Sequence, residues 1–277
     1  MLKDRLIIGI GGGALACLVL LSPYNAFLWI IVSAIVIIAL TELYSTLGYF
    51  KNNIPLTIFG YAAGVAILLS CITFNFAGKI TPQAWILTLI AYLGVLMIYM
   101  VLTHGKTTFA DVSSSFVSTV YAGLSLSHLI LIRNLPEGYF LIWAPVIIAW
   151  LSDTMAYTFG MLFGKHKLIP AVSPKKTVEG AIGGVLGGIV FMVIFGIICA
   201  LFAGKSVNYI NVIILGALGS VLSQFGDLAA SCIKREYNIK DFGNLLPGHG
   251  GIVDRFDSVI VVAPFVYYFI TLFPIFG

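Results

Sequence analysis

Long apolar stretches dominate the chain, and short segments rich in charges, Pro, Gly or Asn separate them. A transmembrane helix needs about 20 mostly apolar residues. The stretches are continuous and do not alternate between apolar and polar positions, as half-buried strands would. The pattern therefore predicts nine helical spans, antiparallel wherever the connection is short. Their expected bounds are 6–21, 27–47, 56–74, 84–102, 112–132, 139–161, 178–202, 207–229 and 255–275.

The composition supports this interpretation. Of the 277 residues, 60% are hydrophobic and 9% are charged, whereas an ordinary soluble domain carries roughly 25% charged residues. A soluble fold of this size could not cover its surface with so few charges. Disorder is excluded as well, because disordered chains are poor in apolar residues. We expect an all-α polytopic integral membrane protein.

The basic residues predict the orientation of the spans. If the N-terminus is cytoplasmic, all but three of the fifteen Lys and Arg residues fall on the cytoplasmic side, the exceptions being Lys79, Arg133 and Lys205. Cytoplasmic loops of membrane proteins carry such an excess of positive charge. The count favours nine spans with the N-terminus inside. The compact chain is typical of a protein of the bacterial inner membrane.

Six acidic residues lie within or beside the predicted spans, near their cytoplasmic ends. An ionised carboxylate in hydrocarbon costs several kcal/mol, so it should face a partner or a watery cavity. For any single acid, a structural salt bridge is an equally good explanation. Six on one side of a chain this poor in charge favour a shared polar cavity. These acids are Glu42, Asp153, Glu179, Asp227, Asp254 and Asp257.

Two of these acids open the last predicted span. Asp254 and Asp257 are three residues apart and share one face of a helix. Asp227 ends the preceding span, and if the helix continues, Ser231, Lys234 and Arg235 would fall roughly on its face. Carboxylate oxygens suit a hard cation such as Mg²⁺, held together with substrate phosphates. An ion pair such as Asp254 with Arg235 is the alternative.

Two polar loops carry further candidates. The stretch 247–251 reads Pro-Gly-His-Gly-Gly, so its backbone N–H groups could approach a ligand, although by itself the stretch is better explained as a tight turn. His249 would donate to a phosphate or cap the turn. In the other loop, Ser173 and Pro174 predict a helix start. Lys175 and Lys176 would then form an anion site, or they set only the topology.

The seventh predicted span contains a regular series of glycines. Gly180, Gly184 and Gly188 recur at every fourth position. Small residues at this spacing let helix backbones approach closely. The series predicts close helix packing, either within one chain or between subunits.

The run 231–257, SCIKREYNIKDFGNLLPGHGGIVDRFD, resembles the signature of the phosphatidate cytidylyltransferases, also called CDP-diacylglycerol synthases. The stretches SDTMAY at 152–157, GKH at 164–166 and SPKKTVEG at 173–180 resemble the same family. The resemblance covers about residues 145–260. It implies transfer of a cytidylyl group from CTP to phosphatidic acid, which yields CDP-diacylglycerol and pyrophosphate. It also implies a requirement for Mg²⁺ and leaves a second cation, K⁺, open.

The resemblance assigns roles to individual residues. Asp227, Asp254 and Asp257 correspond to the metal-binding acids. Their polar catalytic partners are Lys234, Arg235, His249 and Arg255. Substrate contacts are expected from Asp153, Ser173, Lys175, Lys176, Thr177, Glu179, Ser231, Gly250 and Gly251. No Ser or Cys nucleophile is needed, because the phosphate of phosphatidic acid can attack by itself.

These assignments divide the chain by role. Residues 1–135 are expected to form five lipid-facing or dimerising spans, and residues 136–277 a catalytic region whose site faces the cytoplasm. The expected partners are CTP, phosphatidic acid and membrane lipids, with a homodimer suggested by the family and no nucleic acid. Two alternatives stay open. A polyprenol kinase would transfer the terminal phosphoryl group of CTP, and a cation transporter would place its acids near the bilayer midplane.

Overall fold

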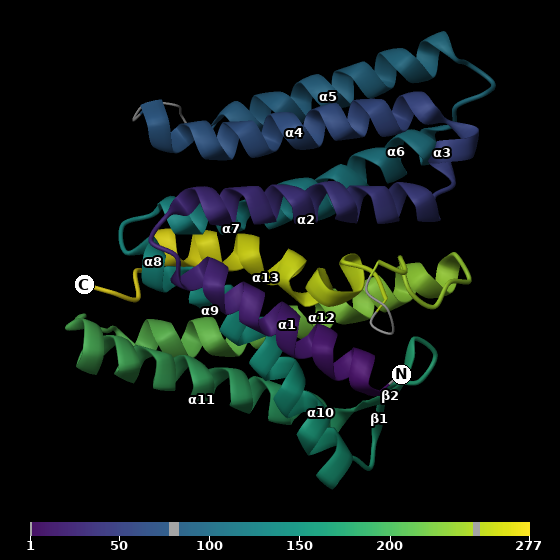
Figure 1. The fold of residues 1–277 in the computed structure, drawn as a ribbon. Coiled ribbons are helices and arrows are strands. Elements are labelled where there is room, and N and C mark those ends of the chain that lie inside the picture. Colours follow the sequence, from purple (N-terminus) through teal and green to yellow (C-terminus); the bar gives the residue numbers. More distant parts are fainter. Residues whose placement is uncertain (1, 78–82, 246–249) are drawn as a thin grey trace. The chain divides into compact units, whose positions relative to one another are not determined.

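The structure, a computed structural model, describes residues 2–77, 83–245 and 250–277, which form helices and a short hairpin (Figure 1). Two compact units share the chain. The first comprises Met1–Asn134 and Asp241–Arg255, and the second comprises Leu135–Lys240 and Phe256–Gly277. The predicted all-α class of membrane protein is confirmed. The division of roles at residue 135 stays a prediction.

The first unit contains the helices drawn in purple to blue-teal in Figure 1. The long helices follow one another through short turns, as the pattern of apolar stretches predicts. Their bounds are α1 Leu2–Leu21, α2 Asn25–Thr46, α3 Tyr49–Asn52, α4 Ile54–Ala77, α5 Gln83–Leu102 and α6 Phe109–Ser118, followed by the π-helical turn η1 Thr119–Leu124 and by α7 Ser125–Asn134.

Buried hydroxyl groups connect the helices of this unit. The Tyr44 hydroxyl from α2 lies 2.8 Å from Oγ1 of Thr119, and the Tyr92 hydroxyl from α5 lies 2.9 Å from Oγ of Ser115. Buried polar groups must find partners of this kind to avoid a desolvation penalty. Gly60 leaves room for the Tyr44 ring, because any Cβ at that position would overlap the hydroxyl. These pairs connect α2 to η1 and α5 to α6.

The second unit is built around three long helices. It contains α8 Gly138–Leu141, α9 Trp143–Val146, the π-helical turn η2 Ile147–Leu151, α10 Ser152–Phe163, the strands β1 Lys167–Ile169 and β2 Ser173–Thr177, α11 Val178–Ala203 and α12 Tyr209–Glu236. The last helix, α13 Val253–Leu272, begins in the first unit and continues in the second.

Glycines of α11 bring three helices of the second unit together. A Cβ at Gly180 would lie 2.7 Å from the Ala156 carbonyl oxygen of α10, and one at Gly184 would lie 3.0 Å from the Ala156 Cβ. At Gly188 a Cβ would overlap the hydroxyl of Ser220 from α12. The predicted close helix packing is therefore confirmed, and here the partners belong to the same chain.

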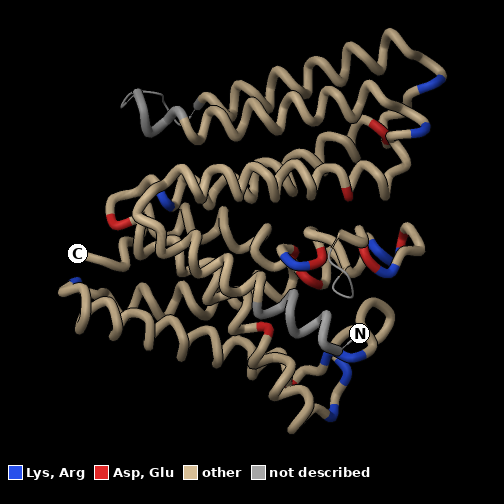
Figure 2. The backbone as a smooth tube through the Cα atoms, viewed as in Figure 1, with Lys and Arg blue, Asp and Glu red and all other residues tan. Residues whose placement is uncertain are grey.

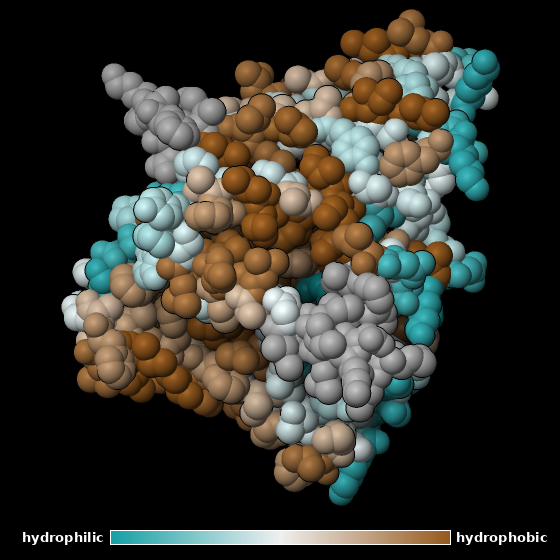
Figure 3. Space-filling model, viewed as in Figure 1, coloured by the Kyte–Doolittle hydropathy of each residue, from teal (hydrophilic) through white to brown (hydrophobic). Residues whose placement is uncertain are grey.

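The apolar helices match the predicted spans closely. Within the described residues, eight helical segments are long and apolar enough to cross a membrane, and Gly11–Leu21 is a shorter apolar stretch within α1. Figure 2 shows most charged residues toward the helix ends, whereas Figure 3 shows apolar side chains along α4, α5 and α11. The chain is an integral membrane protein. The cytoplasmic position of the N-terminus stays a prediction.

Candidate functional site

A cavity of about 340 Å³ lies within the second unit. Asp153 of α10, Asp227 of α12, and the strand residues Lys175 and Lys176 give it a charged lining. Another part of the lining is an apolar wall, which consists of Ala156, Tyr157, Met161 and Leu168. A pocket that combines charges with apolar surface suits a ligand that is itself part polar and part apolar.

An antiparallel hairpin carries the two lysines. Lys167 of β1 pairs with Thr177 of β2, and Ile169 pairs with Ser173. The expectation that Ser173 caps a helix starting at Pro174 is wrong, because both residues belong to β2. Proline fixes φ at a value that an edge strand accepts as readily as a first helical turn, so the dipeptide did not distinguish the two.

Helix α11 begins at Val178, after the hairpin, and Thr177 is its N-cap. The Thr177 hydroxyl accepts a hydrogen bond from the backbone N–H of Gly180, at 3.1 Å. This is the usual role of a Thr at such a position. The lysines therefore reach the cavity from a strand that leads directly into α11, and Thr177 itself lines the cavity.

Lys176 forms an ion pair inside this cavity. Its Nζ is buried and lies 2.6 Å from Oδ2 of Asp227, and the two side chains are 25% and 31% exposed. Partial burial strengthens such a pair relative to one in open water. Because both groups also line the cavity, a phosphate could replace Asp227 as the partner of Lys176.

Two further carboxylates, of Asp153 and Asp257, lie near this ion pair. Asp257 of α13 is 8% exposed and accepts a hydrogen bond from the backbone N–H of Ser258, at 2.7 Å. The Ser258 hydroxyl donates to Oδ2 of Asp153, at 3.0 Å. The charges of Asp153 and Asp257 are close enough to Asp227 to repel it. The three acids are thus within electrostatic range of one another, and the positive charges of Lys176 and Lys234 act on Asp153 and Asp257, respectively.

The basic end of α12 lies one to two turns beyond Asp227. The helix continues to Glu236, beyond the expected end at residue 229, so Ser231, Lys234 and Arg235 extend the same helix. Lys234 is partly buried and offsets the charge of Asp257, whereas Arg235 is exposed. Basic residues are favourable at the C-terminal end of a helix.

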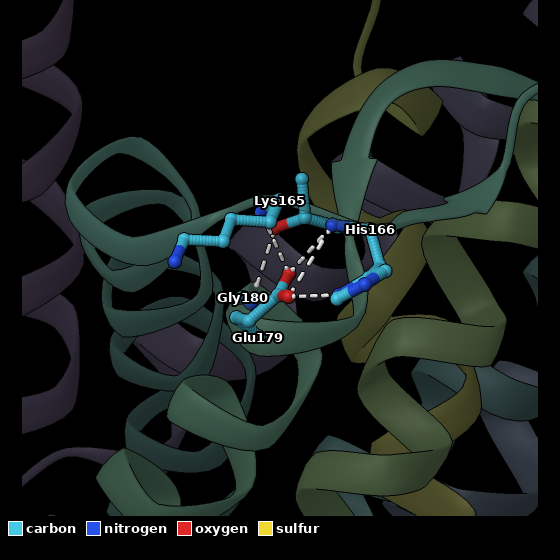
Figure 4. Close-up of polar contacts among 5 residues, drawn as sticks. Lys165, His166, Glu179 and Gly180 are labelled. Atoms are coloured by element: carbon cyan, nitrogen blue, oxygen red, sulfur yellow. Dashed lines mark hydrogen bonds and ion pairs between the residues drawn. The ribbon is translucent and has the colours of Figure 1, made fainter.

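Glu179 closes the loop between α10 and the hairpin (Figure 4). Its carboxylate accepts hydrogen bonds from the backbone N–H groups of Lys165 and His166, at 3.0 and 3.2 Å, and lies 2.6 Å from His166 Nδ1. Figure 4 shows the His166 ring turned toward this carboxylate. Glu179 is absent from the residues that line the cavity. Its hydrogen bonds to Lys165 and His166 hold the loop between α10 and β1.

The remaining acids lie in the first unit. Glu42 of α2 accepts hydrogen bonds from the backbone N–H groups of Ile252 and Val253, both at 2.8 Å. Oδ2 of Asp254 accepts from the N–H groups of Phe242 and Gly251, at 2.8 and 3.0 Å. Both carboxylates therefore engage the backbone around the start of α13.

Other signature residues surround this helix start. Gly250 has a φ of +78°, which glycine adopts without strain. A Cβ there would lie 3.0 Å from Oδ2 of Asp254. Arg255 is exposed on the first turn of α13. Pro247, Gly248 and His249 lie outside the described residues, so the role of His249 stays a prediction.

Comparisons with known proteins identify the chain. The sequence model of the Cytidylyltransferase family matches residues 3–273. This chain belongs to that family. The phosphatidate cytidylyltransferase of Bacillus subtilis is 39% identical over 180 residues, which are 65% of each chain. Those of Staphylococcus saprophyticus and Staphylococcus aureus are 35% and 34% identical, and the matches cover 76% and 86% of this chain and 78% and 87% of theirs.

The family signature is divided between two structural roles. Of the predicted metal-binding acids, Asp227 and Asp257 lie together in the second unit, with Asp153 beside them. Asp254 belongs to the first unit, where it binds backbone N–H groups. Lys175, Lys176 and Thr177 share the cavity with Asp153 and Asp227. Neither Ser173 nor Ser231 is among the cavity residues.

Sequence reasoning missed two polar residues in or beside this cavity. Ser258 donates to Asp153, and Gln224 lines the cavity while its Nε2 donates to the Ala181 carbonyl oxygen at 3.0 Å. A weak signal was present, because Gln224 precedes Asp227 by three residues on one helix face. Ser258 directly follows Asp257 and gave no periodic signal of its own.

Proposed function

We propose that this chain transfers the cytidylyl group of CTP to phosphatidic acid, with release of pyrophosphate and formation of CDP-diacylglycerol. The relatives from Bacillus and Staphylococcus, which are phosphatidate cytidylyltransferases, support this activity. The observation that carries the proposal is the cavity in the second unit, where the Lys176–Asp227 pair lies beside Asp153 and an apolar wall. Such a site can receive phosphates at one end and lipid at the other.

The reaction forms one bond and breaks another at the same phosphorus. An oxygen of the lipid phosphate attacks the α-phosphorus of CTP, and the bond from that phosphorus to the oxygen bridging it to the β-phosphorus breaks. The electron pair leaves with pyrophosphate. Since the nucleophile is already anionic, the protein has to align the two phosphates and stabilise the developing charge. Lys175 and Lys176 are the cations of this cavity that can do so.

The carboxylates of the second unit have the chemistry that Mg²⁺ requires. Mg²⁺ prefers oxygen ligands and usually combines one or two carboxylates with substrate phosphates and water. Asp153, Asp227 and Asp257 supply oxygen donors, and their mutual repulsion would be relieved by a cation. Within either unit, the described residues form no preassembled group of three metal-binding side chains. We therefore propose Asp227 and Asp257 as the principal ligands, with CTP phosphates completing the site.

Bound Mg²⁺ would neutralise phosphate charge and withdraw electrons toward the leaving pyrophosphate. Asp254, the third acid of the predicted metal set, has one oxygen committed to two backbone N–H groups. We assign it to holding the signature loop. A second cation, K⁺, and a homodimer stay predictions from the family resemblance.

We further propose that the cavity faces the cytoplasm of a bacterial cell, because CTP is a cytoplasmic nucleotide and most basic residues lie on the predicted inner side. Bacterial relatives support this location. Lipid would then enter from the surrounding bilayer and CTP from water.

The activity is tested with purified protein in detergent, radiolabelled CTP and phosphatidic acid, with and without Mg²⁺. We expect a labelled CDP-diacylglycerol product and pyrophosphate, both dependent on Mg²⁺. Release of CDP together with a phosphorylated lipid would instead indicate a kinase. Ion movement by the reconstituted protein without CTP binding would indicate a transporter.

A further inference from the structure

Glu42 connects the N-terminal half of the chain to the family signature. It lies on α2, near the end of an apolar helix, and it is only 7% exposed. Its two carboxylate oxygens accept one hydrogen bond each, Oε1 from Ile252 N–H and Oε2 from Val253 N–H, both at 2.8 Å. These partners follow Glu42 by 210 and 211 residues. All three residues belong to the first unit.

Two signature glycines surround the same carboxylate. A Cβ at Gly243 would lie 2.5 Å from Glu42 Oε1, and one at Gly251 would lie 2.5 Å from Glu42 Oε2. Real Cβ atoms do not approach oxygen so closely, so these positions have to be glycine while Glu42 keeps its place. The Glu42 carboxylate thus fills a space between two backbone segments, one at Gly243 and one at Gly251–Val253.

Backbone N–H groups provide the polar partners of this carboxylate. Unpaired N–H groups at the start of a helix carry partial positive charge, and anions bind there. Among the described side chains, no Lys or Arg forms an ion pair with Glu42, so its stabilising partners are backbone donors. Asp254 complements it by accepting from Phe242 and Gly251. Together the two acids satisfy four backbone donors of the signature segment.

We infer that Glu42 is a positioning residue for cytidylyl transfer, which rests on the function proposed above. By contacting Gly243 and Gly251 and accepting hydrogen bonds from Ile252 and Val253, it fixes the start of α13. The same helix carries Asp257 four residues after Val253. Glu42 would therefore act on turnover through the backbone of the signature, without touching the reacting phosphates. This gives α2 a part in catalysis in addition to spanning the membrane.

The test compares Glu42→Gln with Asp111→Asn. Asp111 is a matched control, because its carboxylate also caps a helix of the first unit, where Oδ2 accepts from Thr108 N–H at 2.8 Å. Each variant is assayed below its own melting temperature for kcat and for the KM of CTP and of phosphatidic acid. Hydrogen exchange of residues 250–255 is followed by mass spectrometry in the same preparations.

Glu42→Gln replaces one acceptor by an NH₂ group that faces a backbone donor. We expect kcat to fall about ten- to a hundredfold, as for loss of a charged hydrogen bond, with KM values nearly unchanged and faster exchange at 250–255. Asp111→Asn should lower the melting temperature and leave kcat and this exchange unchanged. If Glu42→Gln does not fold, Glu42→Asp, which keeps the charge but is one methylene shorter, should show the same pattern.

Unchanged kcat in a folded Glu42 variant would overturn the inference, as would an equal loss of kcat in Asp111→Asn. Failure of the proposed function is distinguishable, because wild-type protein would then form no CDP-diacylglycerol, while the exchange of residues 250–255 would still respond to Glu42.

Discussion

The acids of the two units differ in what binds them. In the first unit, the carboxylates of Glu42 and Asp254 each accept two hydrogen bonds from backbone N–H groups. In the second, Asp227 pairs with the Lys176 side chain and Asp153 accepts from the Ser258 hydroxyl, and both acids line the cavity. Backbone partners cannot leave without unfolding the segment, whereas a lysine can exchange its carboxylate for a phosphate.

This difference separates acids that shape the signature from acids that are available to a ligand. Both kinds occur within the signature run 231–257, where Asp254 is of the first kind and Asp257 of the second. A carboxylate with fixed backbone partners stabilises a loop, and its loss affects folding. Carboxylates that lie close together in a cavity repel one another, and a bound cation relieves this repulsion. Mutations in the two sets should therefore produce different phenotypes.

The largest effect is expected for Asp227→Asn. This change keeps the shape of the side chain but removes the negative charge opposite Lys176 and one proposed Mg²⁺ ligand. We expect kcat to fall about 100- to 1,000-fold, the usual cost of removing one preorganised charge from an active site. The melting temperature should stay near that of the wild type. Substantial Mg²⁺-dependent activity in this variant would refute the assignment.

Asp254→Asn should differ from Asp227→Asn by reducing stability. An amide accepts hydrogen bonds from Phe242 and Gly251 less strongly than a carboxylate does. Thermal unfolding in detergent should show a loss of about 1–3 kcal/mol, accompanied by lower activity. If Asp254→Asn abolished Mg²⁺-dependent turnover at wild-type stability, Asp254 would belong with the ligand-binding acids.

A smaller effect is expected for Ser258→Ala. The variant removes the hydroxyl that donates to Asp153 Oδ2 and leaves the backbone N–H on Asp257 in place. A hydrogen bond to a charged group contributes about 1.5–3 kcal/mol, so kcat/KM should fall by about ten- to a hundredfold. The double variant with Asp153→Asn should lose little more than Asp153→Asn alone. Additive losses would show that the two residues act independently.

The smallest effect is expected outside both groups of acids. Glu137 lies 2.6 Å from Lys205 in an ion pair of the second unit, with side chains 40% and 24% exposed. Partly exposed pairs of this kind contribute about 0–1 kcal/mol. Glu137→Gln should therefore leave both kcat and the melting temperature nearly unchanged. A large loss of activity would mean that removing any carboxylate harms the enzyme. The contrast between the acids of the two units would then have no meaning.

The helices could be predicted well because each span requires a long stretch of apolar residues. A span must supply enough apolar residues to cross the bilayer, so the expected 178–202 and 207–229 lie close to Val178–Ala203 and Tyr209–Glu236. The β1–β2 hairpin was missed, because it is short, polar and contains Pro174. The spacing of Gly180, Gly184 and Gly188 predicted close packing correctly but could not name Ser220 as a neighbour.

The site was predicted only in part. Lysines and acids near the ends of spans pointed to Lys176, Asp153 and Asp227, which the cavity brings together. Their pairing depends on how α10, α11 and α12 pack, which local patterns do not encode. The hydrogen bonds of Glu42 with residues 252 and 253 join positions some 210 residues apart. No periodicity in the sequence reports a contact of that kind.

The central claim is that the Lys176–Asp227 cavity binds the phosphates of CTP. The most direct measurement is the KM for CTP of the wild type, Lys176→Ala and Lys176→Arg at saturating phosphatidic acid and Mg²⁺. We predict a rise of about ten- to a hundredfold for Lys176→Ala, as for a lost charge-assisted contact, and a smaller rise for Lys176→Arg, which keeps the charge. An unchanged KM in Lys176→Ala would contradict the account and leave Lys176 as a lysine that only sets the topology.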